Sequence, residues 1–331
     1  MHTIDTSKYN LRTDLIIEKE NFDSTERQTI KQKNITITKL KTSNYNYVTI
    51  SFEDITDKNN FKEVETICIN ELKPIINKYN IKKEEPILII GLGNSKSTPD
   101  SLGPKTINNI LVTSHLYRIG DVENTYQNVS AFKPEVTGIT GIETSEMIKS
   151  IIKTTKTKLL IVIDALASSS IKRVNKTIQI TDSGIEPGSG VGNNRTALNQ
   201  DELGIPVIAI GVPTIVDAST IVSETFEYIK QHFSYQLSIN ESYQNKLIHP
   251  LNQDYSKHKT DLSQDQVELI LGELGKLKQL ELKQLIDEVL IPVKYNLMVT
   301  PKDIDYLIDK LSLLIANTIN KSLHDSFNPT K

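Results

Sequence analysis

Pro86-Ile-Leu-Ile-Ile90 and the segment Gly91-Leu-Gly-Asn94 that follows it decide the fold of this chain. A short apolar run that ends at glycine is typical of a buried strand followed by a tight turn. A second such run, Leu159-Leu-Ile-Val-Ile163, ends at Asp164. Strand-like and helix-like segments alternate from residue 86 to 216. This alternation predicts βαβ units around a mainly parallel sheet.

The other segments complete the prediction of an α/β fold. Alternating polarity over 33–41 and 45–52 predicts an antiparallel hairpin, and helical spacing recurs beyond residue 262. We expect strands at 86–91, 159–164, 176–181 and 205–211, and helices at 54–79, 103–115, 143–154 and 217–232. The predicted organisation is an exposed tail (1–15) followed by one α/β domain over 16–331. That domain has a mainly parallel central sheet flanked by helices. It comprises an N-terminal hairpin (33–52), a βαβ core (86–232) and a helical C-terminal region (262–324).

Composition narrows the class of protein. The 331 residues carry a net charge of −3, and a pI of about 6.1 argues against nucleic-acid binding as the main activity. Cys68 is the only cysteine, which fits a reducing cytoplasmic setting. No apolar run approaches the ~18 residues of a membrane span, and residues 1–20 do not resemble a secretory signal. We therefore expect a cytoplasmic protein with no membrane partner and no direct nucleic-acid partner.

Two aspartates follow the two apolar runs. Asp164 ends the second run directly, and Asp100 lies in Thr98-Pro-Asp-Ser-Leu-Gly-Pro104 after the first. Side chains beyond the carboxyl ends of neighbouring parallel strands converge on one crevice. A close carboxyl pair shares one proton, so its ionised member accepts a proton from water and its neutral member polarises a carbonyl. The alternatives are structural: Asp100 as a helix cap and Asp164 in an Asx-type turn.

A glycine-rich loop over 181–195 is the second candidate feature. Its exposed N–H groups suit an anion or an extended peptide, and a connecting loop with tight turns is the alternative. Arg195 is a candidate partner for an acidic side chain. A dinucleotide site is disfavoured because position 96 is lysine instead of the third glycine, and the scattered histidines show no zinc-ligand spacing. The candidate peptide-binding residues are Gly188, Ser189, Gly190, Gly192, Asn193 and Arg195.

At these residues the chain resembles the germination (spore) protease family of spore-forming bacteria. The matching stretches run along the whole chain: Tyr9-Asn-Leu-Arg-Thr-Asp-Leu15, residues 90–104, Asp164-Ala-Leu-Ala167, Pro187-Gly-Ser-Gly-Val-Gly-Asn193, residues 204–218 and Asn296-Leu-Met-Val-Thr-Pro-Lys302. The chain departs from the family pattern at Glu186, where a histidine often precedes the Pro-Gly pair.

The resemblance implies an atypical aspartic endopeptidase that needs no cofactor, with Asp100 and Asp164 as its catalytic pair. It implies cleavage of small acid-soluble spore proteins on the carboxyl side of acidic residues, in the forespore and spore core. It further implies a homotetramer and a fold similar to the hydrogenase-maturation proteases, which use a metal in the equivalent cleft.

The resemblance also implies an inactive zymogen with a short N-terminal propeptide. We expect self-cleavage after Asp5, leaving Thr6 as the new N-terminus, because an acidic residue there mimics the substrate. The rival hypothesis is a metallo-endopeptidase of the hydrogenase-maturation type that uses the same two aspartates as ligands. It requires a third ligand, for which Glu186 or Asp182 would have to serve.

Overall fold

The computed structural model describes residues 13–18, 26–120, 122–123, 125–188, 196–241, 262–290, 297–325 and 327. The described chain forms two compact units. The larger unit holds the described residues up to Ile215 and from Thr300 onward, and the smaller holds those from Val216 to Val299. The single domain over 16–331 stays a prediction.

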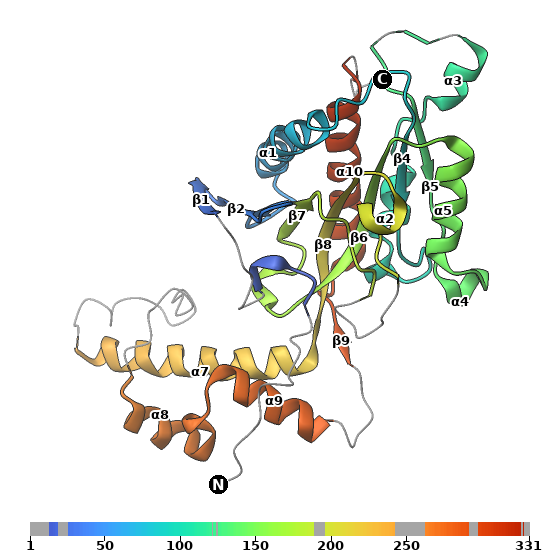
Figure 1. Cartoon of the computed structure of the whole chain (residues 1–331). Coiled ribbons are helices and arrows are strands. Elements are labelled where there is room, and N and C mark those ends of the chain that lie inside the picture. The colour runs from blue at the N-terminus through green and yellow to red at the C-terminus, as the bar shows by residue number, and fades with distance from the viewer. Residues whose placement is uncertain are drawn as a thin grey trace. The chain divides into compact units, whose positions relative to one another are not determined.

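A mixed sheet organises the larger unit (Figure 1). The strand order is β1-β2-β3-β7-β8-β6-β4-β5. The strands are β1 (Glu26–Gln32), β2 (Ile35–Lys41), β3 (Asn46–Ser51), β4 (Ile87–Gly91), β5 (Val129–Phe132), β6 (Leu159–Ser168), β7 (Thr177–Thr181) and β8 (Val207–Asp217), the last of which continues into the smaller unit.

The predicted α/β fold is confirmed, with the parallel pairing concentrated in one part of the sheet. β4 pairs in parallel with β5 and β6, while β1, β2, β3, β7 and β8 pair antiparallel in that order. Only residues 169–176 connect β6 to β7, and these two strands are not neighbours, because β8 lies between them. β2 and β3 form the predicted hairpin; β1 was not predicted because its residues are polar and mostly exposed.

The helices of the larger unit follow the sequence prediction with one correction. They are α1 (Lys58–Asn77), α2 (Leu102–Ile107), α3 (Ser114–Ile119), α4 (Thr137–Thr140), α5 (Thr144–Thr155), α6 (Gln200–Leu203) and α10 (Ile304–Leu323), with short 3-10 helices η2 (Ile16–Glu18), η3 (Thr98–Asp100) and η4 (Ile171–Arg173). The single helix predicted at 103–115 is wrong. Asn320 of α10 accepts from Leu111 N–H and donates to the Asn109 carbonyl, both at 3.0 Å, so a tertiary contact holds the backbone between α2 and α3.

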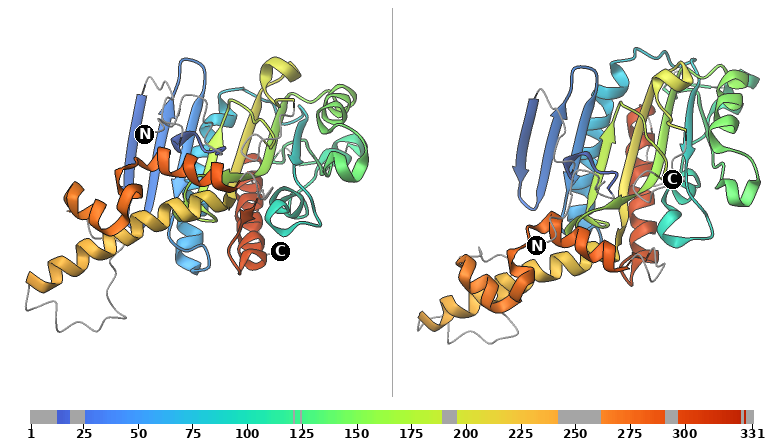
Figure 2. Two further views of the ribbon diagram at one scale, coloured as in Figure 1. Left: turned by 90° about the horizontal axis from the view of Figure 1, so that it is seen from below. Right: turned by 60° about the horizontal axis from the view of Figure 1, so that its bottom comes forward.

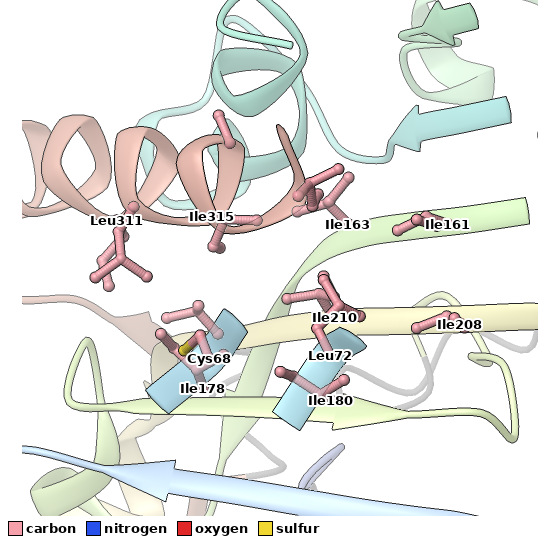
Figure 3. Packing of buried hydrophobic residues seen from close by; sticks show 14 of the residues in the cluster. Cys68, Leu72, Ile161, Ile163, Ile178, Ile180, Ile208, Ile210, Leu311 and Ile315 are labelled. Carbon is pink, nitrogen blue, oxygen red and sulfur yellow. The ribbon is translucent and has the colours of Figure 1, made fainter. Parts of the chain in front are cut away.

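The hydrophobic core lies on both faces of the sheet. On one face α1 and α10 pack against alternate residues of the central strands, as Figure 3 shows for Cys68 and Leu72 of α1 and Leu311 of α10. On the other face α5 packs against the intervening residues, including Ile90, Leu160 and Val162. Because side chains alternate along a strand, Asp164 belongs to the α5 face with Val162.

The smaller unit is helical. α7 (Ala218–Glu241) extends beyond the predicted 217–232 and is followed by α8 (Gln264–Leu271), η9 (Gly272–Lys276), α9 (Gln279–Leu290) and the short strand β9 (Met298–Val299). α9 packs against α7 (Figure 2), and β9 pairs with β8. Asp217 caps α7 by accepting from Thr220 N–H at 2.6 Å.

Among the described residues, no helix combines the length and the apolar character that crossing a membrane requires.

Candidate active site

Asp100 and Asp164 lie at the same edge of the sheet. The described β4–β6 ladder ends with Gly91 opposite Ile163, where Leu92 N–H donates to the Ile163 carbonyl at 2.8 Å. Asp164 is the next residue of β6. The chain after β4 turns back, so that Asn94 N–H donates to the Asp100 carbonyl at 3.0 Å, and η3, which ends at Asp100, contacts β6.

Gly93 makes this turn possible. Its φ of +113° is a backbone conformation that L-residues rarely adopt, and a Cβ at this position would lie 2.0 Å from the Asp100 carbonyl oxygen. The Gly-Leu-Gly motif therefore serves close backbone approach. It brings Asp100 back to the end of β4.

The two aspartates differ in exposure. Asp164 is only 6% exposed, and its Oδ1 accepts from Ala165 N–H at 2.9 Å. Asp100 is half-buried, and the N-cap position of α2 is the next residue, Ser101. One carboxyl group is thus buried and the other is partly open to solvent, a difference that suits two carboxyl groups with different roles in proton transfer.

A cavity of about 210 Å³ opens on the same face of the sheet as Asp164. Leu166, two residues beyond Asp164, lines it, as do residues of β7 and β8. The described residues that line it are Asp14, Ile16, Tyr47, Leu166, Gln179, Thr181, Ser183, Gly184, Ile185, Glu186, Ala197, Asn199, Ala209 and Gly211.

Neutral hydrogen-bonding groups dominate one wall of this cavity. Thr181 Oγ1 and Ser183 Oγ lie 2.9 Å apart. Burial raises the pKa of Tyr47, and a hydrogen bond with Ser183 opposes that rise, so the phenol is neutral near pH 7. The charged residues of the described lining are Asp14 and Glu186. This lining suits neutral hydrogen-bonding groups better than an acidic side chain.

The glycine-rich loop begins and ends beside the cavity. Ile185 and Leu198 exchange backbone hydrogen bonds of 3.0 and 2.8 Å, which bring the two ends of the loop together. Of the predicted loop residues, Gly188 is half-buried, and Ser189, Gly190, Gly192, Asn193 and Arg195 lie outside the described residues. The predicted cleavage residues Asp5 and Thr6 also lie outside them.

The two candidate third metal ligands occupy different environments. The Asp182 carboxylate accepts from Asn46 N–H at 2.6 Å and Asn46 Nδ2 at 2.9 Å, and it pairs with Lys78 at 2.9 Å. Through these contacts the Asp182 carboxylate links β3 and the end of α1 to the end of β7. Glu186 is exposed and lines the cavity. Within the described ranges, no three His, Cys, Asp or Glu side chains cluster to hold a metal ion.

Sequence reasoning missed the N-terminal contribution to the site. The sequence predicts an exposed tail through residue 15, but Leu15 is 0% exposed and Thr13 is buried, while Asp14 lines the cavity. The apolar run Leu15-Ile-Ile17 was the available signal. It is too short to show a periodicity, so only its tertiary contacts reveal its place.

The comparisons with known proteins agree over the whole chain. A family model described as germination protease matches residues 3–331. The germination protease of Bacillus subtilis (strain 168) is 41% identical over 353 residues, covering 97% of this chain and 95% of that protein. That of Geobacillus sp. (strain WCH70) is 40% identical over 361 residues, covering 98% and 97%.

Among solved structures, the NiFe hydrogenase maturation protease HycI from Thermococcus kodakarensis KOD1 is 17% identical, with a TM-score of 0.25. The match covers 39% of this chain and 74% of that one, a similarity too low to support an argument about the site. The sequence matches, by contrast, are extensive and span both units. This chain belongs to the germination protease family.

Proposed function

We propose that this chain is a self-processing zymogen that hydrolyses small acid-soluble spore proteins on the carboxyl side of acidic residues, with Asp100 and Asp164 as a coupled pair. Its family membership makes it a spore-germination endopeptidase. The proposal is supported by the backbone geometry: η3, which ends at Asp100, contacts β6 where the described β4–β6 ladder gives way to Asp164, and Leu166, two residues further on, lines a cavity.

The proposed reaction is attack of water on the peptide carbonyl. The ionised aspartate accepts a proton from the water while the neutral aspartate donates its proton to the carbonyl oxygen. The new C–O bond gives a tetrahedral intermediate. The protonated aspartate then gives its proton to the leaving nitrogen while the ionised aspartate takes a hydroxyl proton from the intermediate, so that the C–N bond breaks as C=O re-forms. The products are a carboxyl group and an amine, and the pair again holds one proton.

Recognition of the acidic residue is assigned to the glycine-rich loop. The cavity lining offers neutral donors and two carboxylates, so an acidic side chain is better placed elsewhere. Arg195 is our candidate, because a guanidinium matches a carboxylate with two parallel hydrogen bonds. The backbone N–H groups of Gly188, Ser189, Gly190, Gly192 and Asn193 then hold the extended substrate chain.

The test is proteolysis of a small acid-soluble spore protein by a chain that begins at Thr6, with and without a strong chelator. Asp100→Asn and Asp164→Asn are each expected to lower kcat by at least about 10³-fold. Glu65→Gln is the matched control, because that buried carboxylate is engaged by Lys321 and Asn317 of α10, away from the cavity. If chelation abolishes the activity and a divalent ion restores it, the acid–base hypothesis is wrong and the metallo-endopeptidase hypothesis takes its place. Glu186 is then the remaining candidate for the third metal ligand.

Self-processing has a separate test. The full chain is expected to convert to a form that begins at Thr6, and Asp164→Asn is expected to remain full length. N-terminal sequencing of the product checks both. A product that begins elsewhere, for example at Leu15 after Asp14, would overturn the site after Asp5.

We also propose that four copies assemble and that the protein works in the forespore and spore core. Both proposals derive from the family. Sedimentation velocity of the purified chain, 37.3 kDa per copy, tests the tetramer. A fluorescent fusion followed through sporulation tests the location.

A further inference from the structure

Glu18 is a buried carboxylate with four donors. Its side chain is 4% exposed. Oε1 accepts from Ser168 Oγ at 2.7 Å and pairs with Arg173 Nε at 2.9 Å. Oε2 accepts from Ser169 N–H at 2.8 Å and from Thr13 Oγ1. A buried charge is tolerated only when it is paired and hydrogen-bonded in this way.

These bonds tie the segment 13–18 to the end of β6. Asp14 adds two more, since its N–H donates to the Ala167 carbonyl at 3.1 Å and its Oδ2 accepts from Ala167 N–H at 2.8 Å. Ile16 N–H donates to Gln179 Oε1 of β7 at 2.8 Å. The segment therefore bridges β6 and β7, and it contributes Asp14 and Ile16 to the cavity wall.

On its β4 side, the end of β6 has no described strand partner, although β8 lies on the other side. The described β4–β6 ladder stops at Ile163, so Asp164 and the residues after it extend past β4. Ser168, the last residue of the strand, is only four positions beyond Asp164. Reaction rates are sensitive to the placement of reacting groups, and a displacement of 1 Å can cost about 10²-fold.

We infer that Glu18 is a positioning residue: it holds the end of β6 to the segment 13–18 and thereby sets the position of Asp164 against the substrate. The inference rests on the proposed function, in which Asp164 reacts. The clamp is defined as Glu18 with its partners Thr13, Ser168, Ser169 and Arg173.

The kinetic test compares Glu18→Gln with Glu65→Gln in the proteolytically active protein, using a small acid-soluble spore protein as substrate. Glu65 is also buried and paired, through Lys321 and Asn317 of α10. Glu18→Gln is expected to lower kcat about tenfold or more with KM changed less than about twofold. Ser168→Ala, which removes one donor, is expected to give a smaller fall and serves if Glu18→Gln does not fold. Equal losses in the Glu18 and Glu65 variants at matched folded fraction would reduce Glu18 to a structural role and overturn the inference.

Hydrogen exchange tests the clamp without reference to activity. In Glu18→Gln the amides of residues 165–170 are expected to lose protection by about tenfold or more, while those of β4 keep theirs. Unchanged protection at 165–170 would overturn the inference. If the wild-type protein cleaves no spore protein, the proposed function fails, and the exchange experiment still decides whether the clamp exists.

Discussion

At the scale of single residues, the site depends on glycine where the chain must fold back. Any side chain at position 93 would clash with the Asp100 carbonyl oxygen, which lies 2.0 Å from the position that a Cβ would take. The same carbonyl accepts the Asn94 N–H that closes the turn. Gly93 is therefore a determinant of where Asp100 lies, although it takes no part in proton transfer.

Gly93→Ala is expected to abolish proteolysis and to cost about 3 kcal/mol of unfolding free energy, since it adds both backbone strain and a clash. Gly120→Ala is the matched control. Gly120 has a φ of +73°, and no neighbouring atom lies within 4 Å of the position that a Cβ would take, so it should cost about 1–2 kcal/mol and leave activity intact. Urea denaturation with activity assays measures both; an active Gly93→Ala enzyme would contradict the account of the turn.

His324 gives the fold a pH dependence. Its ring is 2% exposed, and Nδ1 accepts from Gln127 N–H at 3.1 Å. Burial lowers the pKa of His324 to about 4, assisted by Lys83 and opposed by the hydrogen bond at Leu111 and by Asp325. The neutral ring's contribution is fully present above the unfolded pKa of about 6.5 and is lost as the pH falls toward 4.

The expected loss of stability between pH 7 and pH 4 from this one group is about 3 kcal/mol. His324→Leu removes the titration, so its unfolding free energy should fall less over the same interval than that of the wild type. Denaturant titrations at several pH values make the comparison. Parallel pH profiles for the two proteins would show that His324 does not titrate as described.

At the scale of elements, two long helices cover one face of the sheet. α1 and α10 pack together against β6, β7 and β8, as Figure 3 shows. Asn320 of α10 also holds the backbone at 109–111, directly after α2. α10 thus supports both the sheet and the segment that follows Asp100.

Leu311→Ala and Leu313→Ala separate these contributions within α10. Leu311 is 0% exposed and Leu313 is 40% exposed. Leu311→Ala is expected to cost about 2–5 kcal/mol, because it leaves a cavity in the core. Leu313→Ala should cost at most about 0.5 kcal/mol. Thermal and urea unfolding measure both, and similar losses for the two variants would contradict the packing of α10.

At the scale of the whole molecule, the smaller unit has its own buried ion pair. Lys283 of α9 lies 3.3 Å from Asp217 Oδ2 and donates to Thr220 Oγ1 at 2.7 Å. Burial alone would raise the pKa of Asp217, but Lys283 and the hydrogen bonds from Ser219 and Thr220 outweigh it and lower that pKa. The pair joins α9 to the start of α7.

Lys283→Met is expected to destabilise the smaller unit by about 3–5 kcal/mol, because it leaves the Asp217 charge buried without a partner. The double variant Asp217→Asn with Lys283→Met should recover part of this loss. Lys276→Met, at a far more exposed lysine paired with Glu273, is the control. Limited proteolysis of residues 216–299 reports the local unfolding; equal susceptibility of all three variants would contradict the role of the pair.

A secondary-structure element could be predicted from the sequence where its pattern of polar and apolar residues is local, and was missed where distant residues fix it. β4, β6 and β8 were predicted because buried strands are continuous apolar runs, and β7 because Thr177-Ile-Gln-Ile-Thr181 alternates polar and apolar residues. β5 was missed because Val129-Ser-Ala-Phe132 is only four residues long, and the break between α2 and α3 was missed because Asn320 lies over 200 positions away. At the site, both aspartates were proposed from apolar runs that precede them, although β6 continues past Asp164 to Ser168, whereas Glu18 and Tyr47 carry no local pattern.

By itself the sequence determined the α/β class and the family, because these depend on local apolar runs and on motifs that persist along the chain; it also predicted the two aspartates as the catalytic pair. Only the tertiary structure decided which groups surround those aspartates. The segment 13–18 reaches β6 across some 150 positions, and the cavity is assembled from β3, β6, β7, β8 and two loops. Such contacts arise from packing between distant segments, so no short stretch of the sequence contains a pattern that predicts them.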